Sequence, residues 1–586
     1  MPGVEQACTL VLQAYGHADE LSSPDRDTLS QWRSSYNESV SELAGHFDRD
    51  SDWWFVPLSS RDHFASALQE SFQLAASVDT AMATTSGPLK VVCEDGVLAA
   101  ALADLAALRG WRVHRRLGDR LMWMGRNMRR RIVNLMRLGA QLVRVWRGWG
   151  AGWRYGSWAT RTAGLDIVFV APIHLPVPLN QAEIFCDTYF GALPQTCADR
   201  GSRTAVTGPA LCDPIAHARA ARDIDRIPIV PLESMVTAAD ALAICFQAVM
   251  KWINPPTLPR RLAAKLPRMH AFVHREIADA IALRIQGAQF ERAFGQLLVR
   301  SPNVRVIHTY ENNWWEHAIN RVCNEQAGRP PTIGYLHCAV IESHLKNYRR
   351  KDEVNRPEPD RIVCTGPAAR DVLLSLGEYE PDKVADGFAF RAPDLSSLAR
   401  REGSIGTVKT ILVLLEGLYT MAGFLRMLDK AGPAFEGRRV IVRAHPVLPL
   451  EKLAAIARIP LAPKGHLEPS SGVPLLEDIA RADLVMFKAS STALTAGYIG
   501  VPLVRYRDEW WLSDDPLREC DALKIEVRGS EEVSAAIAHF ENMPTTQLNA
   551  ERARLRSYVD RYFRVPTEEI VSAFGLDPGS QKEVVS

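Results

Sequence analysis

The sequence predicts an α/β protein with two doubly wound parallel sheets that follow a helical N-terminal extension. Its 586 residues exceed what one hydrophobic core usually supports, so two or three domains are expected. From residue 89 onward, short apolar runs of strand length alternate with longer helical patterns, an order typical of parallel sheets covered by helices. The alternation is interrupted at 391–408, which reads as a linker, and a new apolar run begins at 410–415.

The first 85 residues show mainly helical spacing of apolar side chains, so a helical extension is expected there. A strand at 89–93, a helix at 97–109 and a strand near 110–113 then form a β-α-β unit. We expect this unit to open the first doubly wound sheet.

Later strands and helices divide between the two predicted domains. The first domain is expected to contain strands at 165–171, 227–231, 304–309 and 361–365, and helices at 238–252 and 271–298. The second is expected to contain strands at 410–415, 439–443, 484–488 and 503–506. The predicted domains are residues 1–85, 86–390 with a basic insertion at 115–161, 391–548, and 549–586, whose helix at 549–563 should cross back to the first domain.

Bulk composition is that of an ordinary globular protein, with 47% hydrophobic and 23% charged residues. The formal net charge of +1 provides no global field for nucleic acid. Ten cysteines without a CxxC pair favour neither a zinc ribbon nor a disulfide framework, and they suit a reducing cytoplasm. No secretory signal or spanning segment is recognised, so a cytoplasmic protein is expected.

Two motifs in the second half have the chemistry of a phosphate site. A strand ends in Arg443-Ala444-His445-Pro446, and a later strand leads into Ser490-Ser491-Thr492 at a helix start. A helix start offers backbone N–H groups and a favourable dipole, and hydroxyls and an imidazole add further donors. Hydroxyls at this position could also simply cap the helix. Glu416, at the end of strand 410–415, is expected to contact the same ligand.

Residues 440–506, including the turn Gly500-Val501-Pro502, resemble the C-terminal domain of GT-B-type bacterial surface-polysaccharide glycosyltransferases. That group includes capsule polysialyl- and Kdo transferases and teichoic-acid glycerophosphotransferases. The resemblance implies two facing Rossmann-like domains, and it implies that Arg443, His445, Pro446 and Ser490–Thr492 line a nucleotide phosphate. A second block, at about 310–391, resembles uncharacterised surface-carbohydrate biosynthesis proteins, although Leu336 and Cys338 replace the usual amide and glycine of its turn.

An inverting transferase needs a base for the attacking hydroxyl, and four residues are candidates. Glu94 and Asp95 follow the strand at 89–93 and, with Gly96, resemble the acidic motif of bacterial polysialyltransferases. Glu311 follows the strand at 304–309, close to Trp314-Trp315. His337 is the fourth. We expect no cofactor and no metal, since no Asp-x-Asp motif follows a strand.

Residues 115–161 contain twelve arginines, one acid and five tryptophans. Apolar residues between 125 and 147 recur at helical spacing among the arginines, as in a helix that lies on an anionic membrane. A helix that packs between domains with a solvated arginine face is the alternative. Nucleic-acid binding is disfavoured because no recognition motif accompanies the charge.

The sequence thus favours a metal-independent glycosyltransferase of surface-polysaccharide biosynthesis, such as capsule or O-antigen. It would take a nucleotide-activated sugar or glycerol phosphate and a glycan or lipid-linked acceptor, in the cytoplasm or on the inner face of the membrane. A nucleotide-sugar epimerase on the same architecture and a non-catalytic carbohydrate-binding scaffold are the alternatives.

Overall fold

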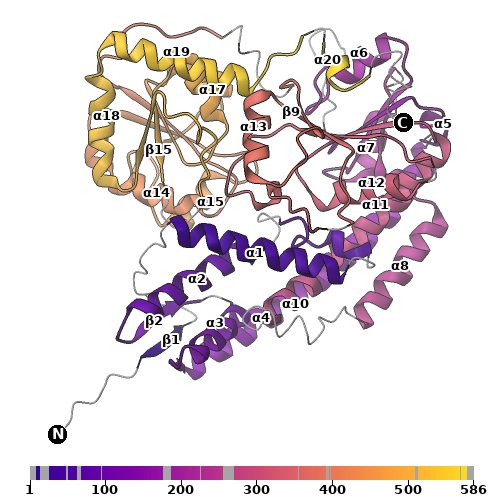
Figure 1. Cartoon of the computed structure of the whole chain (residues 1–586), viewed down its shortest axis with the longest axis horizontal. Coiled ribbons are helices and arrows are strands. Elements are labelled where there is room, and N and C mark those ends of the chain that lie inside the picture. The colour runs from indigo at the N-terminus through magenta and orange to yellow at the C-terminus, as the bar shows by residue number, and fades with distance from the viewer. Residues whose placement is uncertain are drawn as a thin grey trace.

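The computed structural model describes residues 8–13, 26–47, 51–61, 68–93, 95–156, 158–175, 186–222, 224, 226–254, 270–326, 328–353, 355–390, 395, 398–507, 512–567 and 569–576. In Figure 1, an N-terminal unit in indigo lies below two α/β domains that stand side by side. The order of the strands in each sheet decides which of the loops that follow the strands lie next to one another.

The first domain has a seven-stranded sheet in which every pairing is parallel. In chain order its strands are β4 (Ile167–Val170), β5 (Thr204–Gly208), β6 (Ile229–Pro231), β7 (Arg305–Thr309), β8 (Thr332–Leu336), β9 (Arg361–Cys364) and β10 (Val384–Asp386). Their spatial order is β10-β9-β8-β7-β4-β5-β6, so the direction of winding reverses between β4 and β7. This is the doubly wound order 3-2-1-4-5-6 with a seventh strand added.

Helices lie between these strands because both faces of a parallel sheet must be covered. They are α6 (Leu193–Asp199), α7 (Pro214–Ala221), α8 (Ala238–Ile253), α10 (His270–Asp279), α11 (Ile281–Arg300), α12 (Trp314–Glu325) and α13 (Pro367–Leu376), with 3-10 turns η2 (Leu232–Met235) and η3 (Leu345–Asn347); the short helix α5 (Trp158–Arg161) precedes β4. The buried residues of α10 join the core of the N-terminal unit. The single helix expected at 271–298 is divided at Ala280 into α10 and α11.

The second domain has a six-stranded parallel sheet in the same doubly wound order. Its strands are β11 (Thr410–Leu414), β12 (Arg439–Arg443), β13 (Leu467–Pro469), β14 (Leu484–Phe487), β15 (Leu503–Tyr506) and β16 (Lys524–Val527), arranged β13-β12-β11-β14-β15-β16. Its helical elements are α14 (Met421–Lys430), η5 (Gly432–Phe435), α15 (Leu450–Ala457), α16 (Leu475–Arg481), α17 (Thr492–Ile499), η6 (Ser530–Glu532) and α18 (Val533–Glu541). The two-domain Rossmann-like, GT-B-like fold expected from the sequence is therefore confirmed.

The C-terminal helix links the two domains, as the sequence predicted. Helix α19 (Thr545–Tyr562) packs against α17 of the second domain and α13 of the first. Thr365 Oγ1 donates to the Tyr562 carbonyl at 2.9 Å, and Val340 N donates to the Tyr562 hydroxyl at 2.8 Å. The short helix α20 (Ile570–Ala573) then packs on α6 of the first domain (Figure 1).

The N-terminal unit differs from the sequence prediction. Residues Thr9–Gln13 form a strand, β1, between β2 (Leu89–Val92) and β3 (Arg112–Arg115), in a parallel sheet separate from the first domain. The β-α-β unit with α3 (Gly96–Leu108) therefore belongs to this small sheet and does not open the seven-stranded one. A five-residue strand gives only two buried positions, Leu10 and Leu12, and its partners lie far along the chain, so local periodicity could not reveal it.

The remaining elements of the unit are helical: α1 (Arg26–His46), η1 (Ser51–Phe55), α2 (Leu68–Thr84) and α4 (Leu117–Tyr155). The expected helix of the basic segment is thus present as α4, a single helix of 39 residues. None of the helices in the described parts of the chain is both long and apolar enough to cross a membrane.

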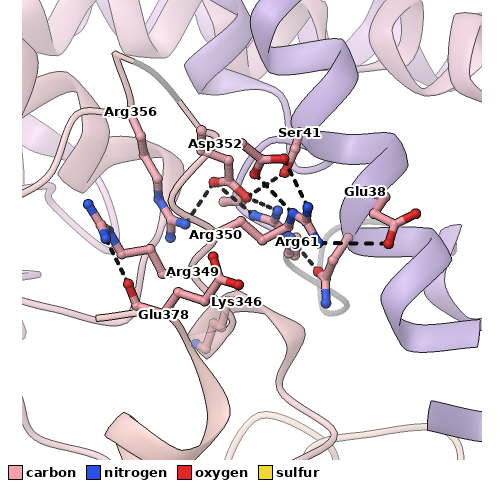
Figure 2. Close-up of polar contacts among 12 residues, drawn as sticks. Glu38, Ser41, Arg61, Lys346, Arg349, Arg350, Asp352, Arg356 and Glu378 are labelled. Carbon is pink, nitrogen blue, oxygen red and sulfur yellow. Dashed lines mark hydrogen bonds and ion pairs between the residues drawn. The ribbon is translucent and has the colours of Figure 1, made fainter. Parts of the chain in front are cut away.

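A buried ion network joins the N-terminal unit to the loop after β8. Figure 2 shows Arg61, which follows η1, beside Ser41 of α1 and the acidic and basic side chains of the loop. Glu353 contacts Arg61, accepts from Arg356 Nη1 at 2.8 Å and accepts from Ser41 Oγ at 3.2 Å. Burial by itself would raise the pKa of Glu353, but the two guanidinium groups outweigh it and lower that pKa.

Removal of the shared carboxylate should destabilise the protein strongly. Glu353→Ala leaves two buried guanidinium groups without their common partner, and such losses cost about 3–5 kcal/mol. The neighbouring Asp352→Ala should cost less than about 0.5 kcal/mol, because Asp352 is 56% exposed and pairs with Arg350 at the surface. Urea unfolding followed by tryptophan fluorescence measures both, since Trp53 and Trp54 lie in the core of this unit. Equal losses in the two variants would contradict the assignment.

Candidate functional site

The first polar cluster lies where the winding of the first sheet reverses. In a doubly wound sheet, ligands bind beyond the carboxyl ends of the strands at this reversal. His174 follows β4, Glu311 follows β7 and His337 follows β8, so all three side chains come from that edge. The topology thus brings together two of the sequence-predicted residues, Glu311 and His337.

Glu311 contacts two basic side chains. Its Oε1 lies 2.9 Å from His337 Nε2, and its Oε2 accepts from Lys346 Nζ at 2.8 Å. Burial would raise the pKa of Glu311, but Lys346 and His337 outweigh it and hold that pKa well below its ordinary value. Glu311 is therefore an ionised carboxylate, suited to orienting an imidazole.

The turn that presents Glu311 is held by Glu316, the N3 residue of α12. Glu316 is fully buried and accepts from the backbone N–H groups of Glu311 and Asn313, each at 2.9 Å. Burial, together with the charge of Glu311, raises the pKa of Glu316 to about 8. Asn312 takes the left-handed conformation with φ of 59°, which asparagine tolerates better than most residues.

His337 has one imidazole nitrogen facing Glu311 and one without a partner. Its Nδ1 is buried and has no hydrogen-bond partner among the residues that the structure describes, and its Nε2, although 2.9 Å from Glu311 Oε1, is not aligned for a hydrogen bond to it. Tyr189 packs edge-on against the ring, with centroids 4.9 Å apart, and the Tyr189 hydroxyl lies 3.1 Å from His174 Nε2. A carboxylate on one side and an open nitrogen on the other is the arrangement of a general base.

The second polar cluster lies at the corresponding reversal of the second sheet, between β11 and β14. Glu416 follows β11, and Ser490-Ser491 leads from β14 into α17. Ser491 occupies the N-cap position without a capping hydrogen bond, and no side-chain hydrogen bond of Ser490, Ser491 or Thr492 to a described residue is present. These hydroxyls are thus not used up in capping the helix.

His445 lies on the other side of β11, after β12. A Cβ atom on Gly417 would come within 3.0 Å of His445 Nδ1, so the turn after β11 touches the histidine loop directly. Neighbouring strands are spaced about 4.8 Å apart, which places the ends of β12 and β14 roughly 10 Å from each other. No sheet separates the imidazole from the hydroxyls, since both come from one edge of one sheet.

Of the other two predicted residues near His445, Arg443 has structural partners and Pro446 is exposed. Arg443 Nη1 donates to Asp478 Oδ2 at 2.6 Å and to the Val473 carbonyl at 2.7 Å. Pro446 is exposed directly after His445, three residues beyond the end of β12, and has no N–H to donate.

Glu416 is next to a charged cluster that sequence reasoning missed. Lys488, only 4% exposed, lies 3.4 Å from Asp514 Oδ2, and Arg505 contacts the other oxygen of Asp514 at 2.6 Å. Burial and the charge of Asp514 raise the pKa of Glu416 to about 8, against the opposing effect of Lys488. In the sequence, this cluster is indicated by Lys488, a lysine directly after the apolar run 484–487.

The remaining base candidates lie elsewhere. Glu94 falls outside the described residues. Asp95 caps α3 through Val97 N at 2.8 Å, and its carboxylate pairs with Arg275 and Arg130 in the N-terminal unit. Near the proposed base, sequence reasoning missed His174, Tyr189 and Lys346. They come from two connections, the one between β4 and α6 and the one after β8, and form no sequence motif.

Within the described ranges, no group of three or more His, Cys, Asp or Glu side chains is arranged to hold a metal ion. A cavity of about 850 Å³ lies beside α4, walled by Arg130, Arg137 and Arg144 of α4 and by Glu276 and Asp279 of α10. None of the predicted site residues lines it.

No protein-family model matches the chain, and no curated protein sequence matches it. Among solved structures it is similar to TarM, with 12% identity over 49% of this chain and 57% of TarM at a TM-score of 0.32. It is also similar to a putative UDP-N-acetylglucosamine 2-epimerase from Listeria monocytogenes (12% identity, 68% and 92% of the two chains, TM-score 0.39). The calicheamicin glycosyltransferase CalG4 gives 14% identity over 70% and 96% of the chains, with a TM-score of 0.36. The chain therefore spans little more than half the length of TarM.

The raised pKa of Glu416 predicts a pH-dependent stability. A carboxyl group whose pKa is about 8 when folded and near 4.5 when unfolded stabilises the fold below pH 4.5, and this contribution is lost as pH rises to about 8. Glu416→Gln cannot ionise, so its stability relative to the wild type should rise by up to a few kcal/mol between pH 5 and 8 and then level off. Urea unfolding at a series of pH values tests this. A difference that stays constant with pH would show that Glu416 titrates normally.

Proposed function

We propose that the protein is a glycosyltransferase that uses a nucleotide-activated sugar. The observation that carries the proposal is the placement of two polar groups where the two doubly wound sheets reverse. The Glu311–His337 pair lies at the reversal of the first sheet, and His445 with the hydroxyls of Ser490–Thr492 lies at the reversal of the second. The loops beyond these edges touch, since Ser343 N donates to the Ser513 carbonyl at 3.0 Å and Arg518 lies 3.1 Å from Glu342. In this proposal, one ligand contacts both domains.

The second domain would hold the donor phosphate. Negative charge grows on the phosphate as the glycosidic bond breaks, and preorganised donors aimed at it lower the barrier. The unused hydroxyls of Ser490, Ser491 and Thr492, the first N–H groups of α17 and the imidazole of His445 are suited to this task. Arg443 would act indirectly, by fixing the loop through Asp478.

The first domain would supply the base. In this proposal His337 Nδ1 takes the proton of the attacking hydroxyl, and Glu311 stabilises the imidazolium that forms. Attack by a deprotonated hydroxyl directly on the sugar carbon inverts the configuration. General base catalysis of this kind contributes about 10²–10⁴-fold to the rate.

The finer assignment concerns the pathway. We propose synthesis of a bacterial surface polysaccharide such as capsule or O-antigen, with a CMP-linked acidic sugar or CDP-glycerol as donor and a lipid-linked glycan as acceptor. The motif resemblance around His445 and Ser490 supports this. We further propose a cytoplasmic protein that meets the inner face of the membrane through the segment 115–161, where such an acceptor would be found.

One observation favours a second candidate, a nucleotide-sugar epimerase. The His337 side chain is only 2% exposed, which suits proton transfer on the donor sugar itself better than contact with a large acceptor. An epimerase would convert the sugar while it remains on the nucleotide. Product analysis separates the two, because a transferase releases free nucleotide.

Nucleotide binding should raise the melting temperature. A ligand at about 100 times its Kd stabilises the folded state by roughly 2.7 kcal/mol. We expect a shift with CMP or CDP in a panel that also contains UDP, GDP and ADP, and a smaller shift in His445→Ala and in Ser490→Ala/Ser491→Ala. A chain that no nucleotide stabilises would instead fit the carbohydrate-binding scaffold.

The Glu311–His337 pair should control turnover without controlling nucleotide affinity. With the donor that this panel identifies, Glu311→Gln and His337→Gln should each lower nucleotide release about 10²–10⁴-fold, since either change removes the oriented base. The thermal shift should persist. Asp95→Asn is the matched control, because Asp95 pairs with arginines in the N-terminal unit, and near-wild-type turnover is expected. Loss of turnover in Asp95→Asn, with turnover kept in the other two variants, would assign the role of base to Asp95.

A further inference from the structure

Helix α8 has two apolar faces. One packs against the first domain, and the opposite one is exposed. Its buried residues, Ala241, Ile244 and Ala248, pack in the core of the first domain. On the other face, large apolar side chains recur every three or four residues and are at least 41% exposed: Leu242, Phe246, Val249, Met250 and Ile253. Figure 1 shows α8 at the outer edge of the molecule, outside α11.

Helix α4 has a matching exposed stripe along its whole length. The stripe consists of Leu117, Leu121, Met124, Met128, Ile132, Leu135, Met136, Val143, Trp146 and Trp153, of which Trp153 is 79% exposed. These positions also recur every three or four residues, so they lie on one side of the helix. The opposite side of α4 packs against the protein.

The two exposed faces adjoin each other. Helices α4 and α8 are in contact, and Leu142 of α4 packs against the core cluster that contains Ala241 and Ile244 of α8. Trp146 lies one turn after Leu142 on the same side of α4 and is already exposed. The exposed stripe of α4 and the exposed face of α8 therefore lie on two contacting helices, and Trp146 of the stripe lies next to the residue that packs toward α8.

Basic residues surround this surface. Helix α4 carries nine arginines and one acid, Asp119, which is buried. Arg120, Arg129 and Arg131 flank the stripe and form no ion pair within the described part of the chain. An apolar surface bordered by arginines and tryptophans fits the interface of an anionic membrane, where rings bury at headgroup depth and cations meet lipid phosphates.

We infer that α4 and α8 together form a docking surface for an anionic membrane. Self-association is a poorer fit, because two copies would bring their arginines together with no accessible acid on α4 to offset them. A surface exposed on two helices docks without spanning the bilayer. The inference deepens the proposed function, because a docked enzyme would have access to a lipid-linked acceptor. Vesicle binding requires neither donor nor acceptor, so the docking inference and the proposed activity can each fail while the other holds.

Sedimentation with vesicles of phosphatidylcholine and phosphatidylglycerol tests the inference with the full chain. At low ionic strength the wild type should sediment with these vesicles and remain in the supernatant with phosphatidylcholine alone. Phe246→Glu on α8 and, separately, Arg129→Gln/Arg131→Gln on α4 should each weaken binding at least about tenfold. These positions are exposed, so the melting temperature should not change.

Matched controls stand in the second domain. Ile456→Glu, at a position 44% exposed on α15, and Arg426→Gln/Arg554→Gln should sediment like the wild type. A wild type that stays in the supernatant at low ionic strength would overturn the inference, as would Phe246→Glu binding as well as the wild type. A wild-type dimer that Phe246→Glu dissociates, with no vesicle binding, would assign the surface to a second copy.

Discussion

Parallel strands that run in one direction must send every following loop to the same edge of their sheet. In a doubly wound sheet the helices on either side of the reversal leave opposite faces, which opens a space between the two central strand ends. This constraint acts twice here, at β4/β7 and at β11/β14. It explains why residues as distant in sequence as His174 and His337, or Glu416 and Ser490, come from one edge without any local motif.

The positioning of Glu311 shows how the fold keeps a charge at such an edge. The turn after β7 is fixed by Glu316, which accepts two backbone N–H groups, and Asn312 bridges to the Ser60 and Lys346 carbonyls at 3.2 Å. The Glu311 side chain is only partly buried, at 26% exposed, and Lys346 and His337 supply contacts that compensate its charge. Part of this support comes from the N-terminal unit through Ser60, so that unit contributes to the site although it donates no proposed catalytic group.

The sequence predicted the second domain better than the first, for a physical reason. Strands 439–443 and 503–506 were predicted with their observed bounds, because each contains a short run of β-branched or other large apolar residues close to a Pro or Gly-Val-Pro turn. Strands β1, β5, β8 and β10 were missed, and so were the edge strands β13 and β16 of the second domain. A short strand is recognised by its distant pairing partners and not by local spacing. At the site, Glu311 stood out as an acid after a predicted strand, and His337 stood out because it lies in the block that resembles surface-carbohydrate biosynthesis proteins. Lys346 and Tyr189 depend on loop packing that spacing cannot supply.

Helix α4 illustrates why a basic amphipathic pattern alone was ambiguous between packing and membrane contact. Cβ atoms on Gly148 and Gly152 would lie 2.4 Å and 2.0 Å from the carbonyl oxygens of Glu233 and Ser234, so small residues let α4 lie tightly against η2. Near the start of α4, Trp123 is buried and donates to the Cys93 carbonyl of the N-terminal unit at 2.9 Å. One side of α4 is thus a structural brace between two parts of the molecule, and the other side carries the apolar stripe. A membrane bound by that stripe would hold the brace, and with it the domain that contains Glu311 and His337, in a fixed orientation.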